Sequence, residues 1–141
     1  METRSSVDVE TLQDALGSVF AEWVRELDLR VLEAKAGEVV LALPVAPRHV
    51  HAGGVVCGQT LMAAADTAMV LAVMTRLGGF EPMTTVQLQT SFLRPVPGSA
   101  QAVRVVARVL RMGSRLVFGE VQLFEPGGQL AAHATTTYAL L

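Results

Sequence analysis

The sequence has little of what several function classes require. Its 141 residues include one cysteine, which excludes an internal disulfide, and three histidines that lack the spacing of a metal site with that cysteine. Only 17% of the residues are charged, and the net charge is −2. Because there is no basic block and no periodic Lys/Arg stripe, nucleic acid is not an expected partner.

Signals for export and for membrane insertion are also missing. The first ten residues, METRSSVDVE, contain no apolar core of the kind found in signal peptides. The longest helical apolar run is interrupted by Asp66, which argues against a membrane span. We therefore expect a soluble, cytoplasmic protein that makes no membrane contact.

Apolar residues, in contrast, are abundant. They make up 51% of the chain, enough to bury a core and to suggest that further surface is hidden in an oligomer. A chain of this length is expected to form one domain, and no linker or repeat divides residues 1–141.

The first half of the chain predicts two helices. Apolar residues recur at helical spacing from Val9 to Leu27, with Asp8 as a plausible N-cap. A second, more apolar helix is predicted over Gln59–Arg76, where Gly78-Gly79 would end it. Between them lie two short predicted strands, at 30–35 and 38–43, and a loop rich in Pro, His and Gly at 44–56.

The second half alternates between apolar and polar residues, as antiparallel strands do. In the first of these strands Val86, Leu88 and Phe92 are expected on one face, opposite Gln87, Gln89 and Ser91. Further strands are predicted at 103–109, 115–124 and 129–140. Two strands, a hydrophobic helix and four more strands predict an α+β domain, with one long antiparallel sheet of about six strands around the central helix.

Asp66 is the one carboxylate within the Ala-rich segment Val56–Val73. An ionised side chain is costly to bury there unless something compensates it. Its helical neighbours three and four residues away, including Met62 and Val70, are apolar. Asp66 either turns to water at a helix edge, or is satisfied by a nearby Ser or Thr hydroxyl, or performs chemistry.

Gly58 lies at the start of the same predicted helix. A glycine lets a carbonyl oxygen approach the backbone closely, and the free N–H groups of the first turn would stabilise an oxyanion. Eight helical residues separate Gly58 from Asp66, which is about 12 Å. This separation is too large for both to act on one carbonyl within one chain, so cooperation would require a symmetric dimer.

The segments CGQTLMAAADTA and TTVQLQTSFLRP together resemble the hotdog-fold acyl-CoA thioesterases of the PaaI-like (phenylacetyl-CoA type) group. The resemblance covers roughly residues 39–141, and the group usually has an N-terminal helix as well. It implies a hotdog fold and hydrolysis of an acyl-CoA to a free acid and coenzyme A. It also implies that no metal or organic cofactor is needed, and that the chain forms dimers that could pair into tetramers.

The resemblance assigns roles to four residues. Asp66 matches the catalytic carboxylate, which activates water or attacks the thioester, and Gly58 matches the glycine whose N–H polarises the thioester carbonyl. Thr85 falls on a hydroxyl position that helps to place the water or the carboxylate. His51 lies where many members have Asn, which makes it a candidate for orienting substrate or water.

Two positions depart from the family pattern. Cys57 occupies the usual His position and Gln59 replaces the second Gly, so both are expected near the substrate with altered contacts. Cys57 could alternatively be a nucleophile assisted by His49 or His51, although a small buried cysteine more often simply packs.

Several other residues have both a functional and a structural interpretation. Arginines at predicted strand ends or turns could bind the phosphates of coenzyme A, or be ordinary surface charge: Arg94, Arg111 and Arg115. His133 lies in a strand and is expected to be structural. Four methionines are expected to fill the core or an interface, or to line an acyl pocket: Met62, Met69, Met74 and Met83.

Two alternatives to hydrolysis stay open at this point. The missing motif His would suit a noncatalytic module that binds acyl-CoA or an acyl carrier. A hydratase on the same fold would pair the Asp with a His a few residues downstream, but Asp66 is followed by TAMVL. Thioester hydrolysis is therefore the favoured prediction.

Overall fold

The computed structural model describes residues 7–141; residues 1–6, which form part of the segment used above to argue against a signal peptide, lie outside the described residues. The elements follow one another in the order α1 (Val9–Leu16), α2 (Glu22–Arg25), β1 (Arg30–Lys35), β2 (Glu38–Pro44), η1 (Pro47–His49), α3 (Gly58–Leu77), β3 (Met83–Phe92), β4 (Ala102–Met112), β5 (Leu116–Phe124) and β6 (Leu130–Leu140).

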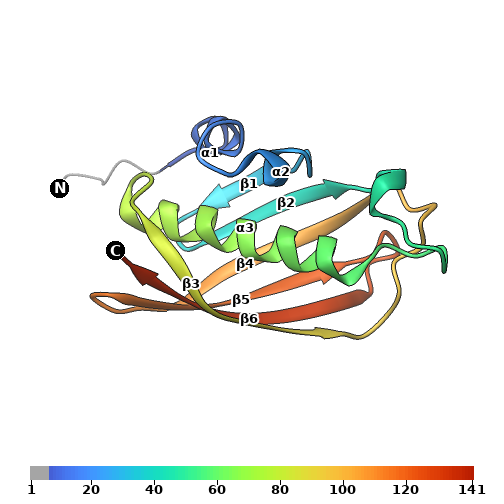
Figure 1. The fold of residues 1–141 in the computed structure, drawn as a ribbon. Helices are drawn as coiled ribbons and strands as arrows, with labels where there is room; N and C mark the ends of the chain where they lie inside the picture. The colour runs from blue at the N-terminus through green and yellow to red at the C-terminus, as the bar shows by residue number, and fades with distance from the viewer. Residues whose placement is uncertain (1–6) are drawn as a thin grey trace.

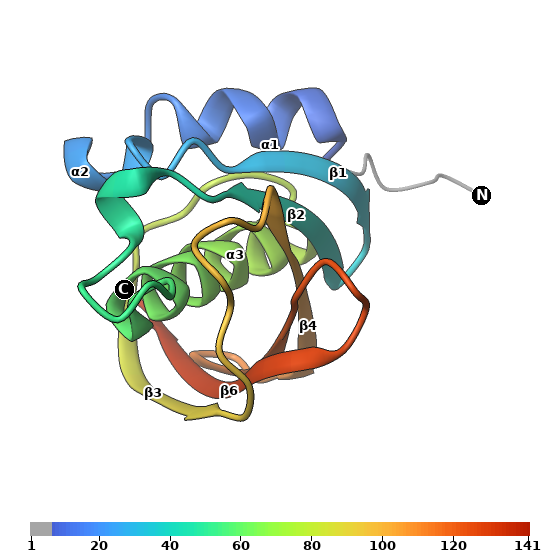
Figure 2. The ribbon, with the colours of Figure 1, turned by 90° about the vertical axis from the view of Figure 1, so that its right-hand side faces the viewer.

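The six strands form one antiparallel sheet in the order β1-β2-β4-β5-β6-β3 (Figure 1). The sheet curves around α3, which lies along its concave face (Figure 2). Helix α1 lies outside this core, next to β1 (Figure 2). The predicted α+β architecture, a hotdog fold with an additional N-terminal helix, is confirmed.

Helix α3 is the centre of the core. Thirteen of its 20 residues are buried, and it ends at Gly78, whose backbone has a left-handed φ of 90° and donates to the Met74 carbonyl. Gly119 on β5 leaves room for the Met69 side chain, because a Cβ there would lie 2.3 Å from Met69 Cε. The helix is long and apolar enough to cross a membrane by composition, but 72% of its most apolar window is buried inside the fold, as in a core helix.

The N-terminal helix differs from its prediction. The expected single helix from Val9 to Leu27 is two helices, α1 and α2, separated by a turn that begins at Gly17. Asp8 caps α1 as predicted, since its carboxylate accepts the Thr11 N–H at 2.8 Å. Gly17 is the C-cap of α1, and beyond the break Leu27 is buried whereas Trp23 is 61% exposed.

The alternation predicted for β3 is wrong at one residue. The β3–β6 pairing shifts between Thr85 and Gln87, so Val86 occupies a bulge and is 59% exposed. Leu88 is half-buried against the core, whereas Phe92 is 50% exposed with its ring beside Gly58. The bulge also turns Thr85 inward, toward α3, together with its β6 partner Tyr138.

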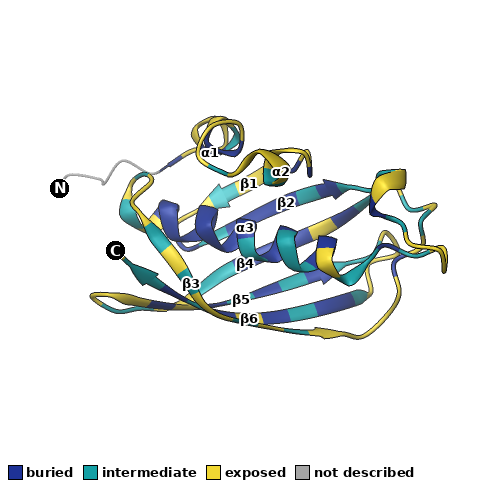
Figure 3. Ribbon diagram, in the orientation of Figure 1, coloured by how far each residue is buried: buried dark blue, intermediate teal, exposed yellow. Residues whose placement is uncertain are grey.

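Buried and half-buried residues alternate along β5 and β6 (Figure 3), and the face of the sheet away from α3 carries a polar network. Arg108 contacts Glu38 at 3.2 Å and Gln122 at 3.2 Å, and His133 contacts Glu120 at 3.0 Å. His133 therefore lies on the face of the sheet away from α3 and bonds within this network, which fits the structural role expected for it.

Candidate active site

Asp66 lies near the middle of α3, on the side that faces β3 and β6. The Thr85 hydroxyl donates to Asp66 Oδ1 at 3.0 Å. The Tyr138 phenol contacts the same Oδ1 and lies 2.8 Å from the Asp66 backbone carbonyl oxygen. Within residues 7–141 no donor is found on Asp66 Oδ2. Two hydroxyls therefore hold one carboxylate oxygen and leave the other free.

Tyr138 is the residue of this cluster that the sequence did not reveal. Its side chain is 3% exposed, and it lies directly opposite Thr85 in the β3–β6 pairing. Burial, followed by the charge of Asp66, raises the pKa of Tyr138 well above its ordinary value, so the phenol stays protonated and acts as a donor. The one available signal was the apolar–polar alternation of β6, which places Tyr138 inward; nothing in the sequence pairs it with Asp66.

A cavity of about 310 Å³ opens beside this cluster. Its polar lining comes from α3, β3 and β6, and includes Asp66, Thr85 and Tyr138. The rest of its lining is mostly apolar and includes residues from the segment that joins α1 to α2. The carboxylate is half-buried, so it is shielded from bulk water but still reachable from the cavity.

Gly58 forms the first residue of α3 and has a different environment. The preceding Cys57 is the N-cap but makes no side-chain capping bond, so no capping side chain occupies the first-turn N–H groups. The Phe92 ring is close, because a Cβ on Gly58 would lie 3.1 Å from Phe92 Cζ. A second cavity, of about 340 Å³, is lined by Gly58, Phe92 and Arg94.

The two cavities share no lining residue. The acid and the helix N-terminus therefore lie in separate depressions of one chain, in agreement with the 12 Å or so expected from helix geometry. One chain alone does not bring the predicted carboxylate and the predicted oxyanion donor together.

The histidines and the cysteine do not join the Asp66 cluster. His51 is exposed and its Nδ1 accepts the Gly53 N–H, while His49 is buried and meets Cys57 only through a backbone bond from the Cys57 N–H to the His49 carbonyl. The Cys57 thiol instead contacts the Thr60 hydroxyl at 3.1 Å. Among the described residues, no histidine side chain is hydrogen-bonded to the thiol, and the Cys–His nucleophile finds no support.

The remaining predicted contacts divide between the two ends of the fold. Gln59 is exposed next to Gly58, and Arg94 lines the Gly58 cavity. Arg111 and Arg115 lie instead at the β4–β5 hairpin, at the opposite end of the sheet in Figure 1. The structure does not unite the three arginines in one protomer, so a shared role toward phosphates stays a prediction.

The methionines divide in a similar way. Met69 and Met74 are buried in the core, and Met62 is half-buried on α3. Met83, at the start of β3, lines the Asp66 cavity. The structural interpretation therefore fits two of them, and a pocket role suits Met83. Among residues 7–141 no group of three or more His, Cys, Asp or Glu side chains could hold a metal ion.

The profile of the Thioesterase superfamily matches residues 53–132, more than half of the chain, and this stretch contains both Gly58 and Asp66. The chain belongs to the thioesterase superfamily. The predicted PaaI-like assignment agrees with this membership and with the structural relatives.

Three relatives illustrate the range of this superfamily. A Saccharolobus solfataricus protein named "Putative esterase SSO2140" is 28% identical over 115 residues, 82% of this chain and 80% of its own. A mutant of the phenylacetic acid degradation protein PaaI from Thermus thermophilus is 29% identical, covers 86% of this chain and 100% of its own, and superposes with a TM-score of 0.76. Zebrafish thioesterase superfamily member 2 is 24% identical and shares the fold, with a TM-score of 0.85 over 96% of this chain and 100% of its own.

Proposed function

We propose that this protein hydrolyses acyl-CoA thioesters to a free acid and coenzyme A. The observation that carries the proposal is the half-buried Asp66 carboxylate, with Oδ1 held by Thr85 and Tyr138 and Oδ2 left without a donor from residues 7–141. Such an arrangement fixes the orientation of a reacting group before the substrate arrives, which is what general-base catalysis needs. The reaction uses no metal or organic cofactor, and we place it in the cytoplasm.

In the proposed reaction Asp66 Oδ2 removes a proton from a water molecule as the water oxygen bonds to the thioester carbonyl carbon. The carbonyl oxygen becomes an oxyanion, which the Gly58 N–H stabilises at the positive end of α3. Collapse of this intermediate breaks the C–S bond, and the coenzyme A thiolate takes the proton from Asp66. Thr85 and Tyr138 keep the carboxylate aligned throughout.

Because Gly58 and Asp66 occupy separate cavities, the complete site is proposed to form between two copies of the chain. Strand β3 is an edge strand of ten residues, and within residues 7–141 its outer edge has no partner strand. Val86, Phe92 and Leu93 on or just after β3 are each at least half exposed. An exposed, partly apolar edge of this length favours association. Pairing of two such dimers into a tetramer stays a prediction.

The test is thiol release by the purified protein from a panel of short, long and aryl acyl-CoAs. Asp66→Asn removes the base while keeping the shape, so kcat/KM should fall by at least about 10³-fold. Asp14→Asn, an exposed change on α1, is the matched control and should keep the parent rate. Parent-level hydrolysis by Asp66→Asn, with its fold verified by circular dichroism, would end the assignment.

The same experiment separates two alternatives. A noncatalytic binding module would bind acyl-CoA in calorimetry but release no thiol. If Asp66 is instead the nucleophile, an acyl–Asp66 anhydride forms as the C–S bond breaks, and mass spectrometry of a rapidly quenched single turnover detects the acylated protein. A general base forms no covalent intermediate.

A further inference from the structure

The cavity beside Asp66 has two chemically different parts. One set of lining residues is polar: Asp66, Thr67, Thr84, Thr85 and Tyr138. The other set is apolar and comes from the α1–α2 segment, α2, α3, the α3–β3 loop and the start of β3: Val19, Phe20, Ala21, Val24, Val70, Phe80 and Met83. Among the lining residues in the described part of the chain, Asp66 is the one charged side chain, and there is no cation.

This charge distribution decides which part of a thioester fits. The phosphates of coenzyme A are anionic, so a cavity with one carboxylate and no cation disfavours them. The Gly58 cavity, in contrast, contains Arg94, which suits a phosphate. The neutral acyl group is the part of the substrate that matches the apolar lining.

Resting on the proposed function, we propose that the acyl group lies in the Asp66 cavity against residues 19–24, and that this wall selects uncharged acyl groups of short to medium length. The cavity of about 310 Å³ is at the small end of ligand sites, which span roughly 300–1,000 Å³. A long chain would exceed it, and an acyl group with a second carboxylate would meet Asp66 without a compensating cation.

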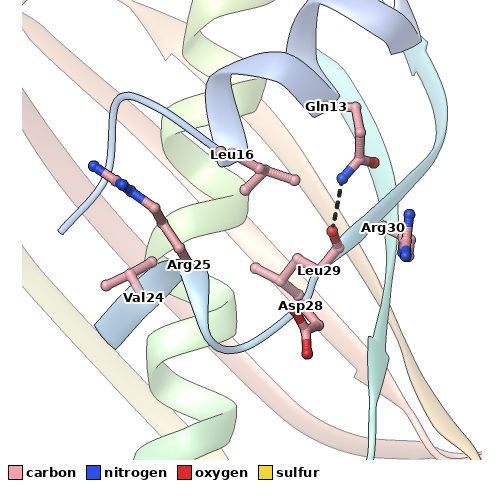
Figure 4. Close-up of a pocket in the computed structure, with 8 residues that line it drawn as sticks. Gln13, Leu16, Val24, Arg25, Asp28, Leu29 and Arg30 are labelled. Atoms are coloured by element: carbon pink, nitrogen blue, oxygen red, sulfur yellow. Dashed lines mark hydrogen bonds between the residues drawn. The ribbon is translucent and has the colours of Figure 1, made fainter. Parts of the chain in front are cut away.

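Hydrogen bonds anchor helix α1 beside β1, and a further bond braces the turn that carries the wall. The Gln13 amide donates to the Leu29 carbonyl at 3.0 Å, drawn in Figure 4, and accepts the Val31 N–H at 2.8 Å. Arg25 Nε donates to the Phe20 carbonyl at 2.8 Å. Val24, labelled in Figure 4, lines the small cavity shown there as well as the Asp66 cavity. The Gln13 bonds anchor α1 and the Arg25 bond braces the turn with Phe20, so we expect this wall to limit acyl length.

The experiment measures kcat/KM for straight-chain acyl-CoAs from acetyl to dodecanoyl, with succinyl-CoA as the charged counterpart of butyryl-CoA. Burial of each methylene should raise kcat/KM by about fourfold until the cavity is full, after which the gain stops. Phe20→Ala should move the optimum to longer chains by at least two methylenes, and Phe20→Trp should move it to shorter ones. Succinyl-CoA should be hydrolysed at least tenfold less efficiently than butyryl-CoA.

Trp23→Ala is the matched control, because this exposed aromatic residue lies in the same segment but outside the cavity lining, and it should leave the profile unchanged. An unchanged optimum in both Phe20 variants, or equal use of succinyl- and butyryl-CoA, would overturn the proposal. Dissociation constants of nonhydrolysable thioether analogues give the same acyl profile without turnover. Absence of hydrolysis together with the expected binding profile would therefore reject the proposed function and leave the acyl site standing.

Discussion

The middle of α3 and its N-terminal turn are built in opposite ways. At Asp66 the reactive group is a side chain, tied to two neighbouring strands by hydroxyl donors. At Gly58 the reactive group is the backbone itself, with no side chain and no capping bond. The Asp66 region can be altered by substituting one side chain at a time. The Gly58 region depends on the backbone position at which α3 begins.

This difference explains why neither region is a complete site. A carboxylate can activate water but cannot stabilise the oxyanion that follows, because both are negative. A helix N-terminus can stabilise the oxyanion but has no base. Each region supplies what the other lacks, and their separation along α3 makes a second chain the natural source of the missing half.

After Asp66→Asn, the largest effect on this comparison should come from removing the Gly58 backbone N–H. Gly58 is the first helical residue, where proline is well tolerated, and the preceding Cys57 has the extended backbone that proline requires. Gly58→Pro should lower kcat by about 10²- to 10³-fold, as loss of an oxyanion donor does. Gly58→Ala keeps the N–H and makes the same close approach to Phe92, so its smaller loss, in the same thiol-release assay, reports the steric part alone.

Mixing two inactive variants tests whether the halves come from different chains. In a mixed dimer of Asp66→Asn and Gly58→Pro, one site has both defects and the other has none. Equal mixing after subunit exchange should restore about a quarter of the parent activity, since half of the dimers are mixed and each has one intact site. If exchange is verified and no activity returns, acid and donor act within one chain.

An intermediate effect is expected from the hydroxyls that hold Asp66. Tyr138→Phe and Thr85→Ala each remove a hydrogen bond to a charged group, worth roughly 1.5–3 kcal/mol, so kcat should fall about tenfold or more. Thr85→Ser keeps the hydroxyl and should retain most of the rate. A merely structural role would change the melting temperature while leaving the pH–rate profile in place, whereas the proposed role shifts that profile.

The smallest effect concerns the loop that precedes Gly58. His49 is 8% exposed, and burial together with the charge of Arg48 lowers the pKa of His49 below its ordinary value of 6.5. The unfolded state therefore binds more protons just below that pH, so the His49 contribution to stability is present above 6.5 and is lost as the pH falls through the folded pKa. The melting temperature should drop as the pH is lowered from about 7.5 to about 5.5, and by less in His49→Gln. Equal pH dependence of His49→Gln and the parent would assign the drop to other groups.

The sequence predicted the central architecture well because its signals are local. Gly78 ends α3 where a left-handed residue was expected, and Asp8 caps α1 through a bond three residues away. The Asp66–Thr85 contact was anticipated from the family pattern rather than from physics. Tyr138 could not be anticipated, because it follows Asp66 by 72 residues and only the sheet pairing brings the two together.

The break between α1 and α2 could not be predicted for a related reason. Periodicity reports which residues are apolar, but not that Leu27 packs in the core while Trp23 stays outside. Gly17 forms the C-cap of α1, and an isolated glycine inside an apolar periodic pattern did not by itself predict this end.

The bulge at Val86 has a consequence for comparing this chain with its relatives. One inserted residue lets β3 direct Thr85 toward the acid while Leu88, three positions later, still packs inward. Deleting it would restore an uninterrupted pleat and rotate every side chain on one flank of the deletion to the opposite face. A gap at this point in a sequence alignment would therefore pair inward-facing residues of one protein with outward-facing residues of the other. The position of the Thr85 hydroxyl can be transferred to a homologue only after the strand register has been checked.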